Sequence, residues 1–124
     1  MQYMLMLYAD ESLWPKLSPA EKEQQMSAAY GAYIEALNKA GVVKGMNRLR
    51  PIADATTVRT AEGKSQVLDG PYADTKEQLG GYFLIDVPDL DSAISWAARC
   101  PAAEQGTVEV RPIWAMPTAA NASA

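Results

Sequence analysis

The distribution of apolar and polar positions divides the first third of the chain into a strand and a long helix. Residues 4–7 form a continuous apolar run, which favours a strand covered on both faces. We expect a helix to begin after Ser18, because Pro19 suits the first helical position and Glu21 completes a capping box with Ser18. The helix should end at Gly41, where a left-handed residue is commonly needed. One helical face carries the apolar residues Met26, Tyr30, Tyr33 and Leu37.

The middle of the chain predicts three short strands and a tight turn. Residues 42–49 suit a strand in which Gly45 indicates a bulge or a close contact. Residues 56–60 and 64–68 flank a short loop that contains glycine, and they therefore predict a β-hairpin. The hairpin leads directly into the tripeptide Asp-Gly-Pro at 69–71, which predicts a tight turn because glycine accepts positive φ and proline fixes its own φ.

The last third of the chain predicts a helical turn, a strand, a helix and a final strand. Residues 74–78 carry capping signals that favour a short helical turn, and residues 82–87 are aromatic and β-branched enough for a central strand. A helix capped by Asp89 should follow, with an apolar stripe made of Leu90, Ala93, Ile94 and Ala97. Residues 107–113 suit a strand, which Pro112 restricts to an edge or a terminus.

The order of these elements predicts an α+β fold. A strand, long helix, strand, hairpin, strand, helix and strand form a ferredoxin-like βαβ–βαβ sandwich with an inserted hairpin. We expect one domain over residues 1–117 and a disordered tail over 118–124, which has nothing to bury. The helices should cover one sheet face only. Because several strands are apolar on both sides, the other face should be covered by a second copy of the chain, which predicts a homodimer.

Composition removes several classes of function. The chain has 124 residues, 48% of them apolar and 21% charged, which is ordinary for a single globular domain. It has no histidine, and this excludes the usual zinc sites, the Ser-His-Asp triad and the Cys-His pair. Cys100 is the only cysteine, so no internal disulfide can form, and we expect it to be structural. The opening apolar run is too short to span a membrane and has no basic leader, which predicts a cytoplasmic protein.

Charge is distributed unevenly along the chain. The net charge of −4 argues against a general nucleic-acid binder, which needs a basic surface. Residues 41–64 nevertheless hold five basic and two acidic side chains, a net charge of +3, whereas the remainder carries −7. This segment can attract an anionic small ligand or an acidic partner. The alternative is an ordinary solvated hairpin surface.

Polar groups suited to binding a small molecule lie beside the turn at 69–71. Asp69, Tyr72 and Lys76 share the loop that enters the central strand, and Asp69 is the candidate catalyst. As alternatives, the Asp69 carboxylate serves only the turn, and Lys76 is solvated. Trp14 can form a cleft wall, and Arg48 and Arg59 can bind a carboxylate or phosphate if their strands face the cleft. Without a glycine-rich phosphate loop or convergent acidic groups, neither a cofactor nor a metal is predicted.

The block from Asp69 to Tyr82, DGPYADTKEQLGGY, resembles the signature of the DGPF proteins, a branch of the YCII-related family. The resemblance implies a fold of the dimeric α/β-barrel type. The resemblance also implies a His–Asp pair in the enzymes of the family, with the histidine on the first helix. This chain has Tyr30 as the nearest equivalent there, which makes Tyr30 a ligand-binding candidate. A tyrosine with a pKa of about 10 is a poor base near neutral pH, so that mechanism does not carry over.

Two classes of function are consistent with these residues. The first is a small-molecule-binding accessory or regulatory protein; the resemblance also implies an association with alternative sigma factors, as for other DGPF relatives. The second is an enzyme of the lyase, isomerase or dehydrohalogenase kind that performs acid–base chemistry on a small cyclic or carbonyl compound. The second requires an ionisable cleft residue with a perturbed pKa, for which Asp69 is the candidate.

Overall fold

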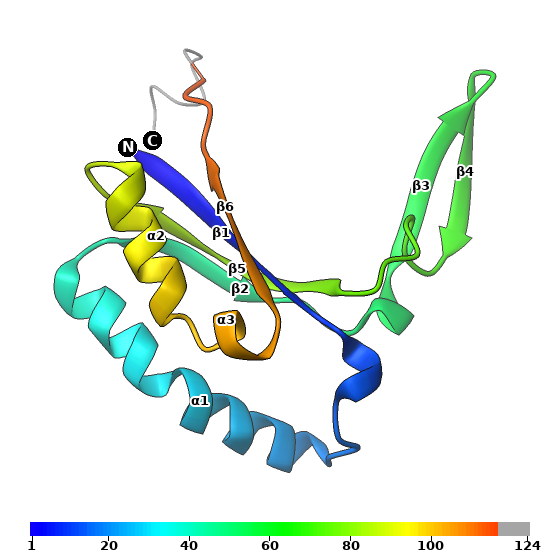
Figure 1. Ribbon diagram of the computed structural model, residues 1–124. Helices are drawn as coiled ribbons and strands as arrows, with labels where there is room; N and C mark the ends of the chain where they lie inside the picture. Colours follow the sequence, from blue (N-terminus) through cyan, green and yellow to red (C-terminus); the bar gives the residue numbers. More distant parts are fainter. Residues whose placement is uncertain (117–124) are drawn as a thin grey trace.

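A computed structural model describes residues 1–116, so the tail expected at 118–124 lies outside the described residues. Four antiparallel strands form the main sheet in the order β2-β5-β1-β6. The strands are β1 (Gln2–Ala9), β2 (Val43–Arg48), β5 (Gln78–Asp86) and β6 (Thr107–Pro112). The helices α1 (Pro19–Ala40), α2 (Leu90–Arg99) and α3 (Ala102–Gln105) lie on one face of this sheet (Figure 1). This arrangement confirms the ferredoxin-like α+β fold, with β6 at an edge as Pro112 predicted.

The long helix α1 begins and ends as its sequence predicts. The Ser18 hydroxyl accepts a hydrogen bond from the Glu21 amide at 3.2 Å, and the Glu21 carboxylate accepts one from the Ser18 amide at 3.2 Å. Gly41 ends the helix with a φ of 69°, a left-handed conformation that glycine adopts without steric cost. Among residues 1–116, no helix is both long enough and apolar enough to cross a membrane.

The core lies between the helices and the sheet. Its largest completely buried side chains come from two central strands, from α1 and from the end of α2: Leu5, Ile85, Leu37 and Cys100. The stripe predicted for α2 is only half correct, because Ala93 and Ala97 are buried whereas Leu90 and Ile94 are each 48% exposed. Small alanines let the helix approach the sheet closely, so the buried face turns toward them and away from the larger residues.

The strand β5 begins four residues before the predicted position and contains two glycines. A Cβ atom at Gly81 would lie 2.8 Å from the Asn47 carbonyl oxygen, so glycine lets the neighbouring strand β2 approach. The helical turn expected at 74–78 is wrong. The Thr75 hydroxyl donates to the Glu77 carbonyl at 2.7 Å, and such side-chain bonds to the backbone compete with a helix.

The predicted hairpin is present as a separate two-stranded sheet. It consists of β3 (Thr56–Ala61) and β4 (Lys64–Asp69), joined by Glu62 and Gly63 with φ values of 52° and 76°. Two left-handed residues are typical of the turn that best fits the twist of a hairpin. Figure 1 shows the hairpin projecting from the sheet on the side opposite the helices.

The sheet face opposite the helices is not covered by any described element. Side chains alternate along each strand, so the neighbours of the helix-facing Leu5 and Phe83 point to this open face. They form two cross-strand pairs, Met4 with Leu84 and Met6 with Tyr82, and all four are partly exposed. The open face is therefore apolar at its centre.

Candidate functional site

Two of the predicted ligand-binding residues, Tyr30 and Arg48, lie on the helix-covered side of the sheet, near enough for the charge of Arg48 to act on the Tyr30 phenol. The register places Leu7, Gly81 and Arg48 in one row across β1, β5 and β2. Phe83 lies in the next row on the helix-covered face, and Tyr30 of α1 stacks on it with ring centroids 6.3 Å apart and planes 24° apart. Because Gly81 has no side chain, no bulky group fills the middle of this row. The exposed Arg48 and the half-buried Tyr30 lie at this end of the core. We call these two residues the Tyr30–Arg48 corner.

The phenol of Tyr30 stays protonated near neutral pH. The pKa of Tyr30 is raised to about 12, chiefly by burial and in smaller part by the nearby Cys100, while the positive charge of Arg48 opposes the increase. A neutral phenol donates a hydrogen bond and does not act as a base. The corner therefore offers an uncharged donor beside a permanent cation.

The neighbouring Tyr33 and Cys100 have structural roles. The Tyr33 hydroxyl donates to the Trp96 carbonyl at 2.8 Å, and burial raises the pKa of Tyr33. Cys100 is 1% exposed, and burial raises the pKa of its thiol above the ordinary value. A protonated, inaccessible thiol is unreactive, as expected for a structural cysteine.

The other predicted site residues lie on exposed parts of the chain. Asp69 ends β4 opposite Thr56 and is exposed, and Tyr72 on the following loop is 79% exposed. Trp14 is 42% exposed and directly follows the 3₁₀ helix η1 (Glu11–Leu13). Lys76 is also exposed, and its positive charge makes a small contribution to lowering the pKa of Asp10. Hydrogen bonds from Ser12 are the larger cause of the lowered pKa of that carboxyl group.

A set of long-range contacts around Glu11 holds the loops at this end of the molecule. The Glu11 amide donates to the Gln78 side-chain carbonyl at 2.9 Å, and the Glu11 carboxylate accepts from the Ile52 amide at 3.2 Å. The Thr107 hydroxyl donates to the Glu77 carboxylate at 2.8 Å. Local patterns in the sequence do not indicate these contacts, because the partners of Glu11 lie 41 and 67 residues away. These contacts fix the ends of β1 and β5.

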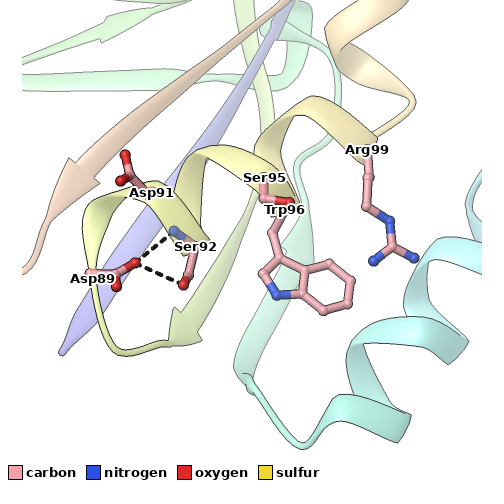
Figure 2. Close-up of a pocket in the computed structure, with 6 residues that line it drawn as sticks. All are labelled: Asp89, Asp91, Ser92, Ser95, Trp96 and Arg99. Atoms are coloured by element: carbon pink, nitrogen blue, oxygen red, sulfur yellow. Dashed lines mark hydrogen bonds between the residues drawn. The ribbon is translucent and has the colours of Figure 1, made fainter.

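Two shallow cavities in the described part of the chain lie elsewhere, along α2 and the segment that follows it. One of about 460 Å³ is lined by Asp89, Asp91, Ser92, Ser95, Trp96 and Arg99 (Figure 2). Asp89 accepts from both the amide and the hydroxyl of Ser92 at 2.8 Å as the cap of α2, and the Arg99 guanidinium lies 4.4 Å from the Trp96 ring centre. These polar groups are thus engaged within the helix. The second cavity, about 360 Å³, lies between Ala29 and the segment 98–105.

No group of metal-binding side chains is present in the part of the chain that the structure describes. Asp10 and Glu11, the adjacent acids of the sequence, have separate partners: Asp10 caps η1 through the Ser12 amide at 2.9 Å, whereas Glu11 binds Ile52. Their oxygens therefore serve the backbone.

Comparison with known proteins gives the family. The sequence profile of the YCII-related domain matches residues 1–117. An uncharacterized protein of Rhizobium meliloti (strain 1021) is 42% identical over 118 residues, which cover 91% of this chain and 92% of that protein. Among solved structures, 5-chloro-2-hydroxyhydroquinone dehydrochlorinase (TftG) of Burkholderia phenoliruptrix AC1100 aligns with 92% of this chain and 94% of its own, at 14% identity and a TM-score of 0.48. The family profile and the Rhizobium relative show that this chain belongs to the YCII-related family.

Proposed function

We propose that the protein is a cytoplasmic homodimer that binds a small molecule carrying an acidic oxygen, and that it serves as an accessory or regulatory protein. The observation that carries this proposal is the strand register, which places Arg48 one row from Phe83, the residue on which the protonated Tyr30 stacks. Arg48 would pair with a carboxylate or phenolate oxygen, and Tyr30 would donate a second hydrogen bond.

The surroundings of the corner favour a flat or cyclic ligand. The half-buried ring of Tyr30 stacks on the buried Phe83, and the partly buried Leu7 lies in the same row as Arg48. Apolar walls with a few polar groups that set orientation are typical of small-molecule sites. A ring with one acidic substituent would use both parts of this corner.

The homodimer is supported by the open face of the sheet. Its central pairs, Met4 with Leu84 and Met6 with Tyr82, are apolar and partly exposed. A second copy that packs the same face against them would bury these side chains in a self-complementary interface. Light scattering tests this directly, and a monomer at micromolar concentration would contradict it.

The enzyme alternative depends on Asp69. Tyr30 is an unsuitable base because its pKa is raised to about 12, so an acid–base reaction would require the Asp69 carboxylate. Asp69 is exposed at the end of β4, whereas a catalytic carboxylate is commonly sheltered from water, which favours binding over catalysis.

A thermal-shift screen of cyclic carboxylic acids and phenols tests the proposal, because a ligand that binds the native state raises its melting temperature. We expect a hit to stabilise the wild type, and to lose most of that effect in Arg48→Gln and Tyr30→Phe. Arg59→Gln is the matched control, since Arg59 is an exposed arginine on the hairpin. Equal stabilisation of all four proteins would refute the Tyr30–Arg48 corner as the binding site. Turnover of the hit that disappears in Asp69→Asn would favour the enzyme instead.

A further inference from the structure

The hairpin of β3 and β4 exposes apolar side chains that nothing in the described chain covers. Val58, Val67 and Leu68 are 62%, 66% and 53% exposed. A two-stranded hairpin alone in water is marginally stable at best. We call residues 56–69 the hairpin arm, and its exposed valines indicate that it packs against another surface.

The strand register places the two valines on one face of the arm and the basic side chains on the other, which also carries Leu68. Val58 pairs with Val67, whereas Arg59 and Lys64 lie at alternate positions that point to the opposite side. We call the side that carries Val58 and Val67 the valine face. Charged side chains favour water, so the valine face is the one suited to contact. Asp69 lies at the base of this same face, because it pairs with Thr56 two positions before Val58.

The arm is a preformed element with a fixed base. The Gly70 amide donates to the Ala55 carbonyl at 2.7 Å, and the Thr57 hydroxyl donates to the Gly70 carbonyl at 2.8 Å. At its tip, Glu62 and Gly63 make a two-residue turn that matches the twist of the strands. Binding would therefore cost little ordering of the backbone.

The direction of the arm identifies its partner. The arm projects on the side of the sheet that the helices leave open (Figure 1). A second copy seated on the open face would lie beside the arm, and two-fold symmetry would place its own arm beside the first copy. The central side chains of the open face are already partly covered, so they have little further area to bury. A stable interface buries about 800 Å² on each partner. The arm supplies further apolar area.

We propose that the valine face of each arm packs against the other copy of the chain, so that the two subunits clasp each other. This inference rests on the homodimer of the proposed function and adds a second contact region to it. It also brings Asp69 to the boundary between subunits, because Asp69 shares the valine face.

Two matched double variants test the clasp. Val58→Thr with Val67→Thr keeps the β-branched shape but places hydroxyl groups on the valine face. As the control, Arg59→Thr with Gln66→Thr introduces two threonines on the opposite face of the arm. We expect the first pair to raise the dimer dissociation constant in sedimentation by about tenfold or more, since four apolar side chains per dimer change. The control pair should change it by about threefold or less.

Hydrogen exchange of the wild-type chain gives a readout that needs no variant. Amides of residues 57–68 should be protected at concentrations where the protein is dimeric and should lose protection on dilution to the monomer. A dimer whose arm exchanges rapidly, or a valine variant that dimerises like wild type, would overturn the clasp and leave the sheet-face dimer intact. A wild-type monomer at micromolar concentration would overturn both proposals.

Discussion

Replacing Gly81 by alanine should destabilise the protein, because β2 leaves no room for a methyl group. The added Cβ atom would lie 2.8 Å from the Asn47 carbonyl oxygen and 3.4 Å from the Arg48 Cα atom. Both are backbone atoms, so no side-chain rotation can relieve the contact. The strand would have to move by several tenths of an ångström, and overpacking of this kind costs about 1–3 kcal/mol. For a domain of this size, that corresponds to a fall in melting temperature of roughly 5–15 °C.

Gly31→Ala is the control for that measurement. Gly31 lies within α1, and a Cβ atom there would have no neighbour within 4 Å. Alanine should stabilise the helix by about 0.5–1 kcal/mol, since glycine loses more conformational freedom on folding. Thermal unfolding followed by circular dichroism should therefore show opposite shifts for the two variants. A Gly81→Ala protein that melts at or above the wild-type temperature would refute the close approach of β2 to β5.

Three further predictions concern the core, the buried thiol and a helix cap. Leu37→Ala should lower the free energy of unfolding in urea by about 2–5 kcal/mol, because Leu37 is completely buried; a loss below about 1 kcal/mol would contradict its place in the core. Cys100 should react with a thiol reagent only after denaturant is added, since it is 1% exposed and its thiol pKa is raised, and rapid labelling of the native protein would disprove this. Hydrogen bonds from Ser92 hold the pKa of Asp89 below its ordinary value of 3.8, so its carboxylate stabilises the fold above that pH and loses this effect as the pH falls through the folded-state pKa. The stability advantage of wild type over Asp89→Asn should therefore shrink on acidification, and an advantage that is constant with pH would argue against the cap.

Local signals in the sequence were sufficient for the main helix and the hairpin. The capping box of Ser18 and Glu21 and the left-handed Gly41 set the ends of α1 through contacts within a few residues. The turn at Glu62 and Gly63 fixes the hairpin in the same way. Such interactions depend on neighbours in the chain, so the chain order alone predicts them, and with them the order of strands and helices that defines the fold.

The candidate site was predictable only in part. Tyr30 and Arg48 were both named from the sequence, as a helix-face residue and a basic strand residue, but their proximity depends on how β2 pairs with β5 and where α1 lies on the sheet. The role of Glu11 as a contact between three loops was missed, since its partners Ile52 and Gln78 are far away in the chain. No spacing rule connects residues so distant.

By itself, the sequence determined the family, the fold class and the ends of its best-capped elements, because these follow from short-range chemistry and an extended shared pattern. Only the tertiary structure decided which side of α2 is buried, where β5 begins and that the hairpin projects from the open side of the sheet. Those features depend on close packing between segments distant in sequence, such as the approach of Asn47 to Gly81, and local propensity is overridden wherever two backbones compete for the same space.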